Sequence, residues 1–305
     1  MKILVATEKP FAPVAVEGIR EIAEKAGHTL ALLEKYTEKT QLLDAVADAD
    51  ALIVRSDKVD AEVLDAAKSL KIAVRAGAGY DNIDLAAATS HGVVVMNTPG
   101  QNANAVAELV AGLLLYCVRG GFNGAAGTEL RGKRLGMMAF GAVAQNLARI
   151  AKGFGMELSA YSPTGHPQKI ADAGLAVCAT PADLFAGNDI VSLHIPSTPE
   201  TRGSIGYDLV VKMPKGGILA NSARQDIIDE DGLLRAMRER EDLRYVTDLK
   251  LKRHEEAVEL LGARYIYTPK KMGAQTKEAN VNAGLAAARQ ICAFFKDDDT
   301  TFKVN

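Results

Sequence analysis

The sequence predicts an α/β protein with two doubly wound parallel sheets. Short apolar runs alternate with helical patterns along all 305 residues, as is typical of parallel sheets covered by helices on both faces. The alternation falls into two series that are separated by one apolar helix. The second series opens with a strand, a glycine-bearing turn and a helix. This length suits two domains of ordinary size.

The first series has short apolar runs bounded by polar residues, which predict buried strands. Helices are expected between them, with starts near Val14, Gln41, Asp60 and Asp84. Strands are predicted over residues 3–6, 31–33, 51–54, 73–76 and 93–96.

Residues 97–120 separate the two series. Apolar residues recur there at steps of three and four from Val106, so the spacing predicts a helix after a turn of proline and glycine. A last helix over residues 276–296 would return the chain to the first domain. We therefore expect one domain over residues 1–98 and 276–305 and a second over residues 99–275, with no regulatory domain appended.

The second series begins with a strand–turn–helix–strand unit over residues 132–163. Such a unit binds a dinucleotide when a G-x-G-x-x-G pattern lets the pyrophosphate reach the helix N-terminus. The three positions hold Ala139, Gly141 and Ala144, and Gly141 matters most because a side chain there would block the phosphates. Ala139 requires a turn without positive φ. The alternative is a glycine turn of some other α/β protein. Strands are predicted over residues 134–139, 157–161, 176–178, 190–193, 217–220, 245–247 and 265–267.

The end of the second strand bears on the choice of cofactor. A Rossmann unit that binds NAD usually has an acid there for the ribose hydroxyl, whereas this chain has Ser162. A serine can bond the ribose but does not repel a 2′-phosphate. Only His166 and Lys169 are near enough to approach such a phosphate, and no arginine is. NAD is therefore preferred, and NADP stays open.

The bulk composition excludes several classes of protein. A net charge of −2 gives no field that attracts nucleic acid or an anionic membrane. The three cysteines are widely spaced, which is typical of small buried residues in a reducing compartment and of neither a disulfide framework nor a metal site. The N-terminus is no signal peptide, and no apolar run is long enough to cross a membrane. We expect a cytoplasmic protein.

Five segments follow one another along the chain: RAGAGYDNID, NTPGQNANAVAE, SLHIPSTPETRGSI, NSARQDIIDEDGLL and TPKKMGAQTKEA. Together they resemble one family. The chain is similar to the D-isomer-specific 2-hydroxyacid dehydrogenases, and within them to short D-3-phosphoglycerate dehydrogenases without regulatory domains. The resemblance implies a flavodoxin-like substrate domain and a Rossmann cofactor domain around a cleft. It implies an NAD-dependent oxidoreductase and a homodimer formed through the helix after Asn97 and residues 122–130.

The resemblance implies that Arg224 binds the substrate carboxylate and carbonyl, for which a guanidinium offers a planar fork that stays charged. It implies that backbone N–H groups of Gly77, Ala78 and Gly79 cradle the carboxylate and that Asn102 assists at the cleft. The alternatives are a surface arginine, a plain strand–helix turn and a helix cap.

Two residues after the third strand bear on the substrate. In phosphoglycerate dehydrogenases this strand end contacts the substrate phosphate, a role that Arg55 and Ser56 could fill with a charge and a hydroxyl. A solvated charge at a strand end is the alternative. Other hypotheses are an unphosphorylated 2-hydroxy acid of the glycerate or lactate type, and a sensor that binds a nicotinamide without catalysis.

Two lysines, Lys270 and Lys271, stand where the family has a catalytic histidine. A lysine is a good acid for reducing an oxo acid, but serves as a base near pH 7 only if its pKa falls through burial or a neighbouring charge such as Arg224. We favour Lys270 and leave Lys271 open. The family's supporting glutamate is replaced by Arg253. The remaining cofactor residues that the resemblance implies are Ala142, Val143, His194, Pro196, Ser222, Ala223, Asp248, beside the nicotinamide amide, and Gly273.

Overall fold

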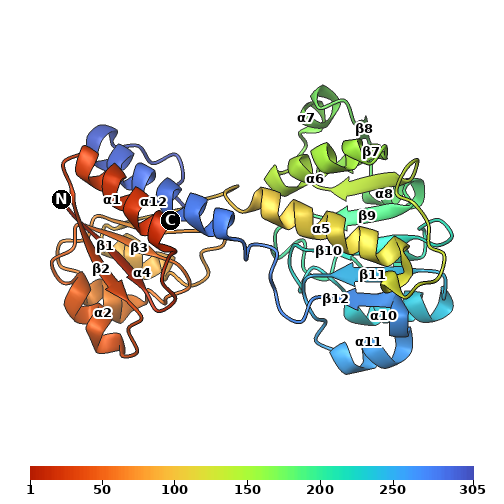
Figure 1. The fold of residues 1–305 in the computed structure, drawn as a ribbon, viewed down its shortest axis with the longest axis horizontal. Coiled ribbons are helices and arrows are strands. Elements are labelled where there is room, and N and C mark those ends of the chain that lie inside the picture. Colours follow the sequence, from red (N-terminus) through yellow and green to blue (C-terminus); the bar gives the residue numbers. More distant parts are fainter. The chain divides into compact units, whose positions relative to one another are not determined.

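The computed structural model describes residues 1–305, which form two compact units. The terminal unit comprises Met1–Asn102 and Gln275–Asn305, and the central unit comprises Ala103–Ala274. Each unit has one parallel sheet covered by helices (Figure 1). The predicted pair of doubly wound sheets is therefore confirmed.

The sheet of the terminal unit has the strand order β2-β1-β3-β4-β5, which is that of flavodoxin-like folds. The C-terminal helix α12 packs beside α1 on one face, as Figure 1 shows in blue and red. The strands are β1 (Lys2–Thr7), β2 (Thr29–Glu34), β3 (Ala51–Val54), β4 (Ile72–Arg75) and β5 (Val94–Asn97). The helices are α1 (Pro13–Lys25), α2 (Lys39–Val46), α3 (Ala61–Ala66), α4 (Leu85–Ser90) and α12 (Lys277–Asp297).

The sheet of the central unit has the order β8-β7-β6-β9-β10-β11-β12, so the direction of strand addition reverses between β6 and β9. This is the Rossmann order with one further strand. Its strands are β6 (Arg134–Met138), β7 (Glu157–Tyr161), β8 (Ala176–Val177), β9 (Ile190–Leu193), β10 (Ile218–Asn221), β11 (Arg244–Thr247) and β12 (Tyr265–Tyr267). Its helices are α5 (Ala103–Val118), α6 (Ala142–Gly153), α7 (Pro167–Asp172), α8 (Pro181–Gly187), α9 (Tyr207–Val210), α10 (Glu230–Glu239) and α11 (His254–Leu261), with 3₁₀ turns η1 (Gly120–Phe122) and η2 (Gly262–Arg264).

The apolar runs form strands because parallel sheets bury both faces. All residues of β3, β9 and β10 are buried. Polar side chains at the predicted helix starts cap their helices: Asp60 accepts from the N–H of Val63 and Asp84 from that of Ala87.

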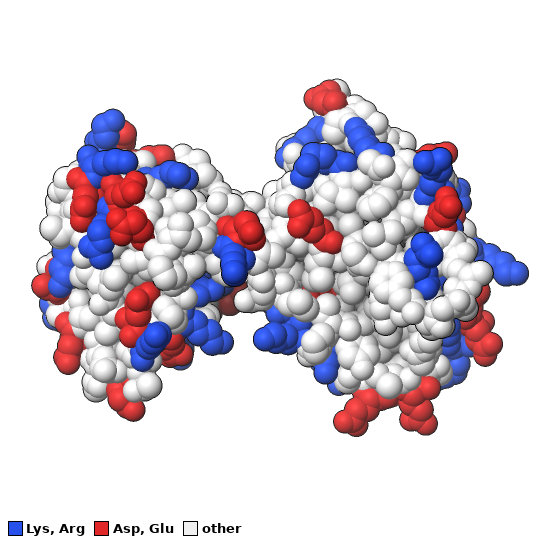
Figure 2. Space-filling model, in the orientation of Figure 1, with Lys and Arg blue, Asp and Glu red and all other residues white.

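Two further features of the structure are the charges on its surface and the apolar character of its helices. On the face shown in Figure 2, acidic and basic side chains are interspersed, and neither sign dominates. None of the helices combines the length and the apolar character that crossing a bilayer requires.

Candidate functional site

The predicted cofactor and catalytic residues of the central unit all follow the carboxyl ends of strands. In a doubly wound sheet this edge is where ligands bind, beside the point where the strand order reverses. The residues after β6, β7, β9, β10, β11 and β12 include, in that order, Gly141, Ser162, His194, Arg224, Asp248 and Lys270.

Gly141 is the N-cap of α6 and leaves open space above the helix. Its backbone is extended, with φ −80° and ψ −168°, and a Cβ added there would meet no protein atom within 4 Å. Ala142 and Val143 form the first turn, whose N–H groups have no partner inside the helix. The helix N-terminus thus has open space of the kind that the pyrophosphate of a dinucleotide requires.

Ala139 corrects the sequence analysis. We expected a turn without positive φ, but the structure has φ 74° there, in the left-handed region. The chain must turn sharply between β6 and α6, and the N–H of Ala139 is already committed to the carbonyl of Tyr161 at 2.9 Å. Left-handed backbone costs an L-residue about 1–2 kcal/mol, so the turn that other Rossmann units make with glycine is strained here.

Ser162 stands directly after β7, where its hydroxyl oxygen accepts a hydrogen bond from the N–H of His166 at 3.0 Å. The hydroxyl proton stays available to a ribose oxygen, which fits the predicted role. His166 and Lys169 are exposed beyond it.

His194 and Ser222 are neighbours across the sheet edge, because Leu193 of β9 pairs with Asn221 of β10. Nε2 of His194 and Oγ of Ser222 are both buried without a hydrogen-bond partner in the protein. Burial lowers the pKa of His194 to about 4, so its ring is neutral at pH 7. Unpartnered buried polar groups are costly, so these two fit a polar ligand such as the cofactor. Pro196 is exposed nearby.

Asn221 orders the turn that carries Arg224. Its side chain is 1% exposed, accepts from the N–H of Ala223 at 3.0 Å and donates to the carbonyl of Arg224 at 2.9 Å. Nη1 of Arg224 bonds the carbonyl of Ala223 at 3.0 Å. We had not assigned Asn221 a role, although an asparagine at the end of a buried strand was a signal for one.

Residues 268–273, which we call the lysine segment, follow β12 and are hydrogen-bonded to Asp248 after β11. Lys270 and Lys271 are exposed, so the burial we considered is absent, while Gly273 is buried. Asp248 accepts hydrogen bonds from Thr268, Met272 and Gly273 of this segment.

Of the acids that follow Asp248, Glu256 is engaged with arginines. Glu256 pairs with Arg253 and Arg238. His254 is half-buried against Tyr267, at 4.6 Å between ring centroids.

In the terminal unit, Arg55 is tied to its own domain. Its guanidinium donates to the carbonyls of Lys9 and Pro10 and to Oδ1 of Asn280, and it lies 5.2 Å over the ring of Phe11. Burial lowers the pKa of the guanidinium without discharging it. Ser56, the next residue, is exposed.

The glycine-rich loop after β4 is held by hydrogen bonds to its backbone. Nδ2 of Asn97 donates a hydrogen bond to the carbonyl of Ala78 at 2.6 Å. Because the peptide is planar and trans, the N–H of Gly79 points in the direction opposite to this carbonyl. The N–H of Gly77 donates to the carbonyl of Arg75 at 2.8 Å, so the expected cradle retains only the N–H groups of Ala78 and Gly79. A Cβ on Gly77 would lie 1.5 Å from Nη1 of Arg75. Asn102 ends the unit just before α5.

Several known proteins are similar to this chain over most of its length. The family model of the D-isomer specific 2-hydroxyacid dehydrogenase catalytic domain matches residues 4–305. A D-3-phosphoglycerate dehydrogenase from Methanocaldococcus jannaschii is 35% identical over 268 residues, covering 83% of this chain and 51% of that protein. A hydroxypyruvate reductase from Thermotoga maritima is 39% identical over 222 residues, covering 67% and 70%.

Among solved structures, the NAD⁺-bound 3-phosphoglycerate dehydrogenase of Entamoeba histolytica is 48% identical, with a TM-score of 0.87, and the match covers 100% of this chain and 98% of that one. The chain spans about half the length of the phosphoglycerate dehydrogenase from Methanocaldococcus jannaschii.

The fold and the strand-end residues define a dinucleotide-dependent oxidoreductase. The chain belongs to the D-isomer-specific 2-hydroxyacid dehydrogenase family. The predicted family is confirmed, and so is NAD as the cofactor that this family uses.

Proposed function

We propose that this chain is a D-3-phosphoglycerate dehydrogenase, which oxidises 3-phosphoglycerate to 3-phosphooxypyruvate at the entry to serine biosynthesis. The observation that carries the proposal is the full-length similarity to the NAD⁺-bound 3-phosphoglycerate dehydrogenase, at 48% identity. The phosphoglycerate dehydrogenase from Methanocaldococcus jannaschii points the same way.

NAD would lie with its pyrophosphate at Gly141 and its nicotinamide end toward His194 and Ser222, and when bound it supplies the hydride acceptor. Arg224 would hold the substrate carboxylate and the oxygen on C2 with its planar fork. The N–H groups of Ala78 and Gly79 would bind the carboxylate from the terminal unit.

A lysine amine would move the proton of the C2 hydroxyl. In oxidation the neutral amine of Lys270 or Lys271 takes this proton, and in reduction the ammonium returns it. Since a free lysine is protonated at pH 7, oxidation is expected to speed up as the pH rises toward 10.

Another D-2-hydroxy acid is the second candidate, because a hydroxypyruvate reductase covers two thirds of the chain and Arg55 is largely engaged within its own unit. Initial rates of NAD reduction with 3-phosphoglycerate, D-glycerate and D-lactate separate the candidates. Arg55→Ala should raise KM for 3-phosphoglycerate by about 10-fold or more and leave that for D-glycerate within about 3-fold. Equal changes for both substrates favour the second candidate.

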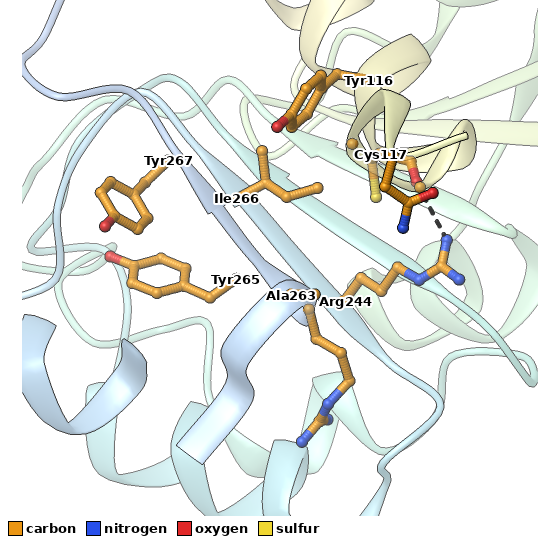
Figure 3. A pocket seen from close by; sticks show the side chains of 11 residues that line it. Tyr116, Cys117, Arg244, Ala263, Tyr265, Ile266 and Tyr267 are labelled. Atoms are coloured by element: carbon orange, nitrogen blue, oxygen red, sulfur yellow. Dashed lines mark hydrogen bonds between the residues drawn. The ribbon is translucent and has the colours of Figure 1, made fainter. Parts of the chain in front are cut away.

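We also propose a homodimer formed through α5 and the segment after it. Phe122 is 68% exposed and lies edge-to-face against Tyr116, at 5.2 Å between ring centroids. Beside them is the pocket of Figure 3, where Tyr116, Ile266 and Arg244 are among the lining residues. A cytoplasmic location is proposed from the composition alone.

A further inference from the structure

Asp248 holds the lysine segment through its backbone. The side chain follows β11 and is 1% exposed. Oδ1 accepts from the N–H of Met272 at 2.9 Å and lies 2.7 Å from the hydroxyl of Thr268, while Oδ2 accepts from the N–H of Gly273 at 2.7 Å. A buried carboxylate is costly unless it is hydrogen-bonded, and these three partners all belong to the segment that carries the lysines.

The close approach depends on a glycine. A Cβ on Gly273 would lie 3.0 Å from Oδ2 of Asp248 and 3.3 Å from Cγ2 of Val106, so the backbone reaches the carboxylate only because residue 273 has no side chain. At Gly273 the segment therefore lies between the carboxylate of Asp248 and the side chain of Val106.

The other end of the segment is fixed by the sheet. The N–H of Thr268 donates to the carbonyl of Thr247 at 3.1 Å, which continues the pairing of β11 with β12. The Thr268 hydroxyl lies 2.9 Å from the carbonyl of Lys270 as well as near Asp248, and can donate its proton to either. Lys270 and Lys271 thus lie in a short span with both ends anchored.

We propose that Asp248 is a positioning residue for the lysine that moves the proton. The family fixes its histidine through the side chain, with a glutamate. In this chain a carboxylate instead fixes the residues on either side of the two lysines. A lysine has no tautomer to set, but its long stem places the amine well only if the Cα position is fixed. The inference rests on the proposed function and differs from the contact with the nicotinamide amide that we first expected of Asp248.

The test is Asp248→Asn, which keeps the shape but turns an acceptor oxygen into an amide that donates. We expect kcat with 3-phosphoglycerate to fall about 100-fold, because misplacement of a catalytic group by about 1 Å has effects of that size. KM and the Kd for NAD, measured by calorimetry, should stay within about 3-fold. A fall in NAD affinity as large as the fall in kcat would make Asp248 a cofactor contact and overturn the inference.

A double-mutant cycle separates positioning from general destabilisation. In a Lys270→Ala, Lys271→Ala background, Asp248→Asn should lower the residual kcat by less than about 2-fold, because no amine remains to be placed. The same 100-fold loss in that background would show that Asp248 does not act through a lysine.

Hydrogen exchange of the protein without cofactor tests the anchor independently of activity. Asp248→Asn should speed exchange at Met272 and Gly273 by about 10-fold or more and leave β9 and β10 unchanged. Unchanged exchange at both amides overturns the anchor. If the wild type does not oxidise 3-phosphoglycerate, the proposed function fails, while this measurement still decides whether Asp248 anchors the segment.

Thr268 supplies a milder variant in case Asp248→Asn does not fold. Thr268→Val removes one hydroxyl from the carboxylate and should lower kcat about 3- to 10-fold, whereas Thr268→Ser should keep the wild-type value. Wild-type kcat in Thr268→Val, together with unchanged exchange at Met272, would contradict the proposal.

Discussion

Ala139 shows how one residue can depart from a motif at a cost. The first position of the G-x-G-x-x-G turn, between β6 and α6, keeps a left-handed backbone even though the glycine is absent. The methyl group is partly buried against the core beside β9, which offsets part of the strain.

Ala139→Gly should therefore stabilise the protein. Relief of the left-handed alanine exceeds the added entropy of glycine in the unfolded chain, for a net gain of about 1 kcal/mol in the free energy of unfolding. Urea titration measures it. Ala142→Gly, in the first turn of α6, is the matched control and should destabilise by up to about 1 kcal/mol. A loss in both variants would contradict the φ of Ala139.

Replacing each of the two lysines is expected to change kcat to a different extent. Lys270→Ala is expected to lower kcat by about 10² to 10⁴-fold, the usual contribution of a general base, and Lys271→Ala by less than about 3-fold. Steady-state rates across pH 7 to 10 measure this. The reverse order would assign the proton to Lys271, and activity unchanged in both variants would exclude a lysine from the step.

His194 makes stability depend on pH. Its folded pKa of about 4 lies below the ordinary value of 6.5, so the unfolded chain takes up a proton first as the pH falls. The contribution is complete above pH 6.5 and is lost between pH 6.5 and 4, by about 3 kcal/mol at most. His194→Asn should flatten the fall in unfolding free energy across this window, and parallel curves for the two proteins would contradict it.

At the level of elements, α6 begins at the glycine-bearing turn and is the helix proposed to bind the NAD pyrophosphate. Its first turn is exposed at the sheet edge, and its buried residues, among them Leu147 and Ala151, pack the rest of the helix onto the core. An added methyl at the open N-terminus would thus meet ligand and not protein.

Gly141→Ala should raise the Kd for NAD by about 10-fold or more and leave the melting temperature unchanged, because its Cβ meets no protein atom and the backbone suits alanine. Gly153→Ala, at the other end of the same helix and equally open, is the control and should not affect NAD binding. Calorimetry with NAD measures both, and equal affinities in the two variants would place the pyrophosphate elsewhere.

Sequence reasoning located most elements but few of the contacts between them. Apolar runs predict strands such as 51–54 and 190–193 because burial on both faces constrains each residue locally. The bonds of Asp248 and Asn221 join residues that only the folded sheet brings together, and the φ of Ala139 is imposed by its surroundings. Spacing along the chain carries no signal for such contacts.

On the scale of the whole molecule, self-association follows from the proposed α5 surface. Phe122→Glu would place a charge in that interface and should convert a dimer into a monomer in light scattering after size-exclusion chromatography. Phe302→Glu changes another exposed phenylalanine, in the terminal unit, and should not alter the mass. A monomeric wild type, or a dimeric Phe122→Glu protein, would reject this surface.

The central claim is that an arginine and a lysine act together on 3-phosphoglycerate with NAD. The direct measurement is NADH absorbance after mixing 3-phosphoglycerate and NAD with the wild type, with Arg224→Ala and with the Lys270→Ala, Lys271→Ala protein. The wild type should form NADH between pH 7 and 10, faster at the alkaline end, and each variant should be slower by about 100-fold or more. No NADH from the wild type across this range, or wild-type rates in either variant, would contradict the claim.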